Sequence, residues 1–164
     1  MSYNPKLESV GNYKIDSSLS GNRVKVYHNS KTNEAIIVHR GTKDWPDVFT
    51  DIKMAMGFKN TPRFLHAKKI QTQAEKKYEN TKIYTIGHSL GGNLAESSNV
   101  NGKVITYNKF SMGANSKTKK SQIDIRSSHD PISYLSKEND YTLNSKPKNL
   151  FNEHSVNRLL DKID

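Results

Sequence analysis

Residues 82–92 read KIYTIGHSLGG, a short apolar run that leads into a serine flanked by glycines. The β-branched and aromatic residues of 82–86 predict a buried strand. Gly87, Ser89 and Gly91 fit the pattern G-x-S-x-G, in which a strand turns abruptly into a helix and holds the serine in a strained conformation. The stretch therefore predicts an α/β fold with Ser89 at the carboxyl edge of a parallel sheet; the alternative is an ordinary glycine-rich turn.

The segments around this motif alternate between predicted strands and helices. Residues 23–27 and 34–39 are short runs rich in β-branched side chains, separated by turn residues, which predicts a hairpin. Residues 61–80 begin with Thr-Pro and carry apolar side chains at helical spacing, so a helix of about five turns is expected. The other expected elements are a short helix start at 91–95, strands at 103–107 and 122–126, and a terminal helix at 156–163. This alternation predicts an α/β sandwich.

Length and composition favour one small domain. The chain has 164 residues, of which 33% are hydrophobic, and residues 1–21 are predicted as an irregular N-terminal arm or a weak edge strand. No apolar run approaches the roughly 20 residues that cross a bilayer, and residues 1–11 lack the apolar core of a secretory signal. Cysteine is absent, which excludes disulfides and thiolate metal sites. We therefore expect a soluble protein of a reducing compartment.

The net charge of +10 has two interpretations. It favours attraction to phosphate-rich surfaces, or it reflects a compositional bias toward lysine. The lysines are scattered along the chain and outnumber the arginines, whereas nucleic-acid sites favour forked arginines and stacked aromatic rings. We therefore expect no specific nucleic-acid binding and regard peripheral contact with an anionic membrane as open.

A serine nucleophile needs a base that takes its proton. In α/β-hydrolases the order along the chain is serine, acid, histidine, which leaves His129 and His154 as bases. His154 lies just before the predicted terminal helix, at a junction where a side chain can turn toward the site. His154 is therefore the predicted base, and the alternative for it is an exposed helix-cap histidine.

The base needs an acid that orients it. Asp130 follows the predicted strand 122–126 and precedes Pro131, at the usual place of the orienting carboxylate. An Asp before Pro is also a common turn residue, and this alternative stays open. Asp124, within the strand, and Asp140, in a polar stretch, fit the role less well.

The tetrahedral intermediate needs two N–H donors for its oxyanion. Leu90, directly after the nucleophile, is the first predicted donor. The second is expected in a loop after an earlier strand, and Thr42 follows the strand at 34–39. The alternative is a plain turn built on Gly41.

The combined motifs resemble the class 3 lipases, the fungal triacylglycerol lipase-like group of the α/β-hydrolases. The resemblance covers about residues 24–160. It is carried by 39–45 (HRGTKDW), Asp47, 50–52, Gly57-Phe58, 86–92 (IGHSLGG), 104–107, Gly113, Asn115, 129–132 (HDPI) and His154.

This resemblance implies a three-layer α/β-hydrolase-like sandwich around a central, mixed and mostly parallel sheet, in a minimal domain without metal or cofactor. It implies a triad of Ser89, Asp130 and His154 and an oxyanion hole of Thr42 and Leu90. Residues 43–60 take the place of the family's lid. The apolar residues expected in an acyl-facing or membrane-facing flap include Trp45, Phe49, Met54, Met56 and Phe58. Packing of these residues onto the sheet is an equal alternative.

The expected activity is hydrolysis of acyl esters by two-step acyl transfer through Ser89. Acylglycerols, phospholipids and smaller esters are the substrates considered. Two alternatives remain open: a catalytically silent α/β domain that binds lipid or an anionic surface, and an acyltransferase or thioesterase with the same triad.

Overall fold

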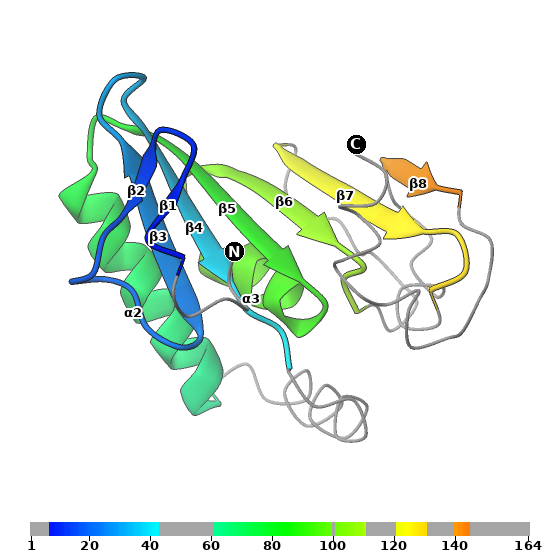
Figure 1. The fold of residues 1–164 in the computed structure, drawn as a ribbon. Coiled ribbons are helices and arrows are strands. Elements are labelled where there is room, and N and C mark those ends of the chain that lie inside the picture. The colour runs from blue at the N-terminus through cyan, green and yellow to red at the C-terminus, as the bar shows by residue number, and fades with distance from the viewer. Residues whose placement is uncertain (1–6, 43–60, 100, 111–120, 131–139, 145–164) are drawn as a thin grey trace.

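The computed structural model of the protein describes residues 7–42, 61–99, 101–110, 121–130 and 140–144. Within these ranges the strands form one eight-stranded sheet, whose strands follow one another in chain order (Figure 1). The strands are β1 (Ser9–Val10), β2 (Tyr13–Ile15), β3 (Val24–Asn29), β4 (Glu34–His39), β5 (Lys82–His88), β6 (Lys103–Tyr107), β7 (Gln122–Ser127) and β8 (Tyr141–Leu143). The helices are α2 (Pro62–Lys77) and α3 (Leu90–Ser98).

The sheet has an antiparallel part and a parallel part. Strands β1 to β4 pair antiparallel, and β3 and β4 form the predicted hairpin. The turn between them contains Asn33 at φ 52°, a left-handed conformation that asparagine tolerates better than most residues. Strands β4 to β8 pair in parallel, and α2 and α3 connect β4 to β5 and β5 to β6. The predicted mixed, mostly parallel sheet is therefore present.

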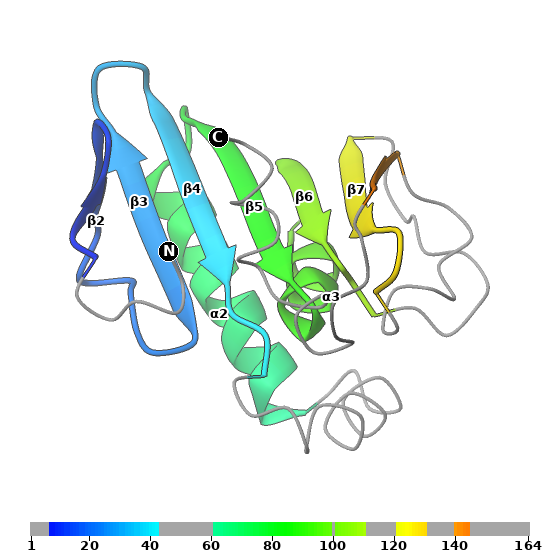
Figure 2. The ribbon, with the colours of Figure 1, turned by 45° about the vertical axis from the view of Figure 1, so that its right-hand side comes forward.

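Both described helices lie side by side on one face of the sheet (Figures 1 and 2). Part of the core between α2 and the sheet consists of Val24, Val26, Ile37 and Ala74, all buried. The described residues thus show two of the three expected layers, and the terminal helix predicted at 156–163 lies outside them.

Helix α2 begins where the sequence indicates. Thr61 is its N-cap and accepts a hydrogen bond from the Phe64 N–H at 3.5 Å, while Pro62 occupies the first turn, where no N–H is needed. The helix ends at Lys77, and the following Tyr78 donates its hydroxyl hydrogen to Asp16 at 2.8 Å. Because β4 leads into α2, this helix starts at the carboxyl edge of the sheet (Figure 2).

The N-terminal segment differs from an irregular arm. Strand β2 extends the sheet beyond β3, with Lys14 opposite His28 and Ile15 opposite Tyr27. Its Tyr13 hydroxyl donates to Glu34 on β4 at 2.7 Å. The edge-strand interpretation of this segment was therefore the better one, and the short β8 was not predicted.

No helix in the described part of the chain is long and apolar enough to cross a membrane.

Candidate active site

The turn between β5 and α3 has the geometry that the glycine spacing predicts. Ser89 separates strand from helix and adopts φ 56° and ψ −131°, a strained conformation for a residue with a side chain. A Cβ atom at Gly87 would collide with the carbonyl group of Gly91, so only glycine fits there. The Ser89 N–H donates to the Tyr107 carbonyl at 3.0 Å. The backbone thus forms the strained strand-to-helix elbow that the G-x-S-x-G pattern predicts.

The Ser89 hydroxyl is held in a buried position. The residue is 2% exposed, and its Oγ has no hydrogen-bond partner among the described residues. A buried hydroxyl without a partner is costly, which favours a functional reason for its position. The described histidines do not bond to it: His88 stacks on Tyr107, and His129 pairs its Nδ1 with Ser128 Oγ at 2.9 Å. His154, the predicted base, lies outside the described residues.

Asp130 lies just beyond β7, two strands from β5 along the sheet. It is fully buried, and its N–H donates to the Ser127 carbonyl at 3.2 Å. Aspartates in ordinary turns are mostly exposed to solvent, so this burial favours the orienting carboxylate over the turn residue. Asn108, at φ 45°, accepts the Ser127 N–H at 2.7 Å and thereby fixes the end of β7.

The loop after β4 lies beside the elbow. Strands β4 and β5 pair in parallel up to His39, which is opposite Gly87, so both chains leave the sheet at the same edge. A Cβ atom at Gly91 would collide with the His39 carbonyl oxygen, which shows that the loop packs directly on α3. Leu90 is the first residue of α3, where an N–H has no acceptor within the helix. Thr42 ends the described part of this loop.

Arg63 contacts the same loop from the first turn of α2. Its Nη2 donates to the Arg40 carbonyl at 2.8 Å and its Nη1 to Thr42 Oγ1 at 3.4 Å. Arg63 gave no signal in the sequence, where it is one more polar residue in a predicted helix.

A group of buried, uncharged polar side chains lies between α2, α3 and strands β4 and β5. We call it the neutral network: His39, Gln71, Thr85, Ser98 and Asn99. Gln71 Nε2 donates to Thr85 Oγ1 at 3.0 Å, and His39 Nε2 lies 3.4 Å from Gln71 Oε1 and 3.3 Å from Ser98 Oγ. Burial lowers the pKa of His39 to about 4, so this imidazole is neutral at physiological pH.

A second buried group joins α3 to β6 and β7 and contains charges. We call it the ionic network: Glu96, Thr106, Lys109, Gln122 and Asp124. Lys109 Nζ lies 2.8 Å from Glu96 Oε2 and 3.2 Å from Asp124 Oδ2. Asp124 also accepts hydrogen bonds from Thr106 and Gln122. Asp124, a residue of β7 that was considered as a weaker candidate for the acid, is therefore an ion-pair partner of Lys109.

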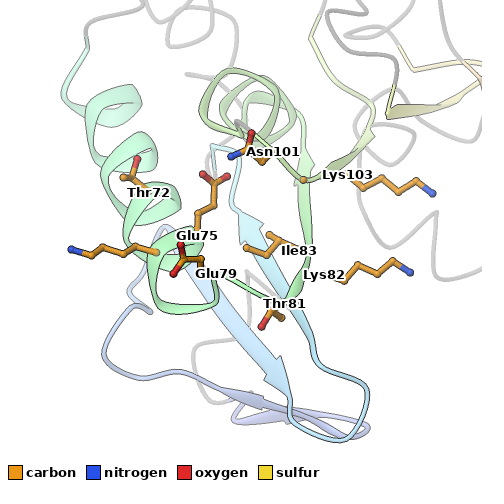
Figure 3. A pocket seen from close by; sticks show the side chains of 10 residues that line it. Thr72, Glu75, Glu79, Thr81, Lys82, Ile83, Asn101 and Lys103 are labelled. Carbon is orange, nitrogen blue, oxygen red and sulfur yellow. The ribbon is translucent and has the colours of Figure 1, made fainter.

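A cavity of about 690 Å³ lies at the amino ends of the parallel strands, opposite the edge that carries Ser89. It is lined by the start of β5 and β6, including Lys82 and Lys103, and by Glu75 and Glu79 near the end of α2 (Figure 3). Because Ser89 follows the end of β5, this cavity is separate from the elbow. No group of three or more His, Cys, Asp or Glu residues within the described ranges could hold a metal ion.

The predicted lid at 43–60 lies outside the described residues, including its apolar members Trp45, Phe49, Met54, Met56 and Phe58.

One comparison with known proteins identifies a family. The model of a phospholipase-like family, described as Tle-like phospholipase domain, matches residues 6–131. A comparison with curated proteins gave no match.

Several solved lipase structures have a similar fold. The triacylglycerol lipase of Penicillium expansum is 16% identical, with a TM-score of 0.53 over 81% of this chain and 67% of the lipase. The Lip2 lipase of Yarrowia lipolytica is 17% identical, with a TM-score of 0.46 over 75% of this chain. The chain covers 62% of the length of Lip2. The comparison with the Penicillium expansum lipase confirms the expected lipase-like α/β-hydrolase fold.

Proposed function

This chain belongs to the Tle-like phospholipase domain family, and from that premise we propose that it is a serine hydrolase that cleaves acyl esters of lipids, with phospholipids as the first substrates to test. One observation carries the proposal: Ser89 is held at positive φ in a strand-to-helix elbow with its hydroxyl buried. Such strain costs about 1–3 kcal/mol and persists where the surrounding structure enforces it, typically at functional sites.

The proposed reaction is a two-step acyl transfer. His154 Nε2 takes the proton of Ser89 while Oγ attacks the ester carbonyl carbon, and Asp130 orients the imidazole. The tetrahedral intermediate collapses, the protonated His154 gives its proton to the leaving alcohol, and an acyl-serine remains. Water, deprotonated by His154, then attacks the acyl-serine. As the fatty acid leaves, Ser89 Oγ takes the proton back from His154, so both residues return to their starting state.

The oxyanion of both intermediates is proposed to bind at the junction of the β4 loop and α3. The N–H of Leu90 at the start of α3 and the N–H of Thr42 are the donors. The contact of Gly91 with the His39 carbonyl brings these two segments together, which supports the assignment. The N-terminus of α3 adds a partial positive charge that favours the oxyanion.

Peripheral contact with an anionic membrane is proposed for the first half of α2. Leu65 is 54% exposed there, Lys68 and Lys69 are exposed next to it, and residues 62–74 contain no acidic residue. The helix begins at the edge of the sheet that carries Ser89. Co-sedimentation with vesicles of anionic and of zwitterionic phospholipid tests this contact, because a K68E/K69E variant should lose binding to the anionic vesicles; unchanged binding would remove the support.

An acyltransferase and a thioesterase would use the same residues and differ only in the acceptor or the substrate. Supplying acceptor alcohols or thioesters separates them from an ester hydrolase. A silent lipid-binding domain is the less favoured alternative, because binding does not require a strained serine.

The deciding experiment measures fatty-acid release from phospholipid vesicles and hydrolysis of soluble p-nitrophenyl esters by the purified protein. The test variant is Ser89→Ala, and the matched control is Ser97→Ala, which removes an exposed hydroxyl from the same helix. We expect the parent and Ser97→Ala to be active and Ser89→Ala to lose at least about 10³-fold in kcat. A folded parent that hydrolyses neither substrate refutes the proposal in favour of a silent lipid-binding domain.

A further inference from the structure

We infer that Arg63 is a positioning residue of the oxyanion hole: its guanidinium group fixes the loop 40–42 and the hydroxyl group of Thr42. The inference rests on the proposed function of Ser89, since an oxyanion forms only if that serine attacks an ester. It assigns a role in catalysis to a residue of α2, an element that contributes none of the proposed reacting groups.

Two hydrogen bonds of Arg63 reach the loop, at residues two positions apart. Nη2 donates to the Arg40 carbonyl at 2.8 Å, and Nη1 donates to Thr42 Oγ1 at 3.4 Å. A planar guanidinium group that holds a carbonyl and a hydroxyl at once restricts both the position and the rotation of the segment between them. The segment held in this way ends at the proposed oxyanion donor, Thr42.

The loop needs this support because its pairing in the sheet has ended. The last β4–β5 pair joins His39 to Gly87. Beyond it, the Arg40 N–H still donates to the Arg23 carbonyl at 2.9 Å, which fixes one side of the residue. Arg63 fixes the carbonyl on the other side, so the peptide group that follows Arg40 has a defined orientation.

The backbone that carries the Arg63 side chain is held in place on both sides. Thr61 caps α2 directly before it, and Phe64, directly after it, is buried with an exposed fraction of 8%. Arg63 is half-buried. This anchoring restricts the movement of the guanidinium group and of the loop that it holds. The restriction matters because a shift of about 1 Å in a reacting group can cost about 10²-fold in rate.

The direction of the hydrogen bond to Thr42 has a chemical consequence. Guanidinium nitrogens only donate, so Thr42 Oγ1 is the acceptor and its own hydroxyl hydrogen remains available to donate elsewhere. Thr42 then offers the oxyanion a hydroxyl hydrogen in addition to its backbone N–H. The positive charge of Arg63 beside the loop favours the same developing negative charge.

The test compares three variants on a soluble p-nitrophenyl ester, which avoids membrane effects. Arg63→Met removes the donors and keeps the length of the side chain, Arg63→Lys keeps the charge, and Lys76→Met removes an exposed cation from the last turn of the same helix as a control. We expect Arg63→Met to lower kcat by about 10- to 100-fold with KM within about twofold, because the loss is in the transition state. Arg63→Lys should fall between Arg63→Met and the parent, and Lys76→Met should equal the parent.

Two further readouts separate positioning from a general loss of structure. In an Arg63→Ala variant, added guanidinium ion at millimolar concentration should restore part of kcat, whereas ammonium ion should not. In a Thr42→Val background, Arg63→Met should cost less than in the parent, since part of its effect passes through the Thr42 hydroxyl. A parent that is active while Arg63→Met keeps its kcat within twofold overturns the inference.

The hold on the loop is also measured without activity. Amide hydrogen exchange of Gly41 and Thr42, followed by NMR, should be at least about tenfold faster in Arg63→Met than in the parent and unchanged in Lys76→Met. Equal exchange in Arg63→Met and the parent overturns the inference even if the esters are not hydrolysed. An inactive parent with slow exchange at these amides refutes the proposed function alone.

Discussion

The elbow helix α3 is anchored on its two sides by different chemistry. The neutral network connects it to α2, β4 and β5 through Ser98 and Asn99. Its members are uncharged, and Gln71 also donates to the Glu75 carboxylate at the border of the network, at 2.9 Å. The ionic network connects it to β6 and β7 through Glu96, whose carboxylate binds the buried Lys109. One helix is therefore held by dipolar hydrogen bonds on one side and by full charges on the other.

The difference teaches how each side should respond to change. A buried hydrogen bond between neutral groups contributes about 1 kcal/mol net, and losing a partner costs about 1–3 kcal/mol. When a buried charge loses its partner, the folded state is destabilised by about 3–5 kcal/mol, because the remaining charge stays buried with neither a partner nor water to stabilise it. The ionic side should be the more sensitive to substitution, and the neutral side should respond to pH through His39.

The largest effect is expected from Lys109→Met. This change leaves the carboxylates of Glu96 and Asp124 close together without the ammonium group that both of them contact. We expect a loss of about 3–5 kcal/mol in the free energy of unfolding, measured by urea denaturation. The control is Lys103→Met, an exposed lysine at the start of β6, which should change stability by less than about 0.5 kcal/mol.

Removing all the charges together sharpens this result. The triple variant K109M/E96Q/D124N should be closer to the parent than Lys109→Met alone, because no isolated charge remains buried. If the triple variant were less stable than Lys109→Met, the attraction between the charges of the ionic network would exceed the free-energy cost of burying them.

The next effect is the pH dependence of stability caused by His39. Its pKa is lowered by burial to about 4 in the folded protein, against about 6.5 when unfolded, so the unfolded state binds more protons between these values. The stability that is linked to the lowered pKa of His39 is complete above pH 6.5 and is lost as the pH falls to 4. Over that range His39 should cost about 3 kcal/mol of stability. Urea denaturation at several pH values measures it.

The matched variant for this effect is His39→Gln, which removes the titrating group. Its stability should fall less steeply than that of the parent between pH 6.5 and 4, even if it is less stable at pH 7. Parallel curves for the two proteins would mean that another group causes the pH dependence.

The smallest of the three effects is expected from Gln71→Leu. The change removes the donor to Thr85 Oγ1 and Glu75 Oε1 and the acceptor near His39, and it leaves the Thr85 hydroxyl and the His39 imidazole buried. We expect a loss of about 2 kcal/mol in the free energy of unfolding. Gln73→Leu, an exposed position on the same helix, is the control and should be nearly neutral. A loss as large as that of Lys109→Met would remove the proposed difference between the networks.

Features set by neighbouring residues could be predicted from the sequence. The predicted bounds of β4 and β6 agree with the structure, and β7 extends one residue further. The elbow was visible because its constraint is local: the close approach of Gly87 to Gly91 leaves no room for a side chain. The position of Asp130 after β7 followed from the same alternation of strands and turns.

Features that depend on contacts between distant segments could not be predicted. Lys109 and Asp124 are 15 positions apart, and nothing in either segment indicates that they meet. Arg63 and Thr42 are 21 positions apart. Strands β1, β2 and β8 are only two or three residues long, too short for an alternating pattern to be recognised.

The most direct test of Ser89 as the nucleophile is labelling of the folded protein with a fluorophosphonate probe, followed by peptide mass spectrometry. A reactive serine displaces fluoride from phosphorus and keeps the phosphonyl group, so the modified residue is identified directly. We predict one adduct, on Ser89, which is absent from Ser89→Ala and present in Ser97→Ala. An adduct on another residue, or ester hydrolysis by a protein that forms no adduct at Ser89, would contradict the account.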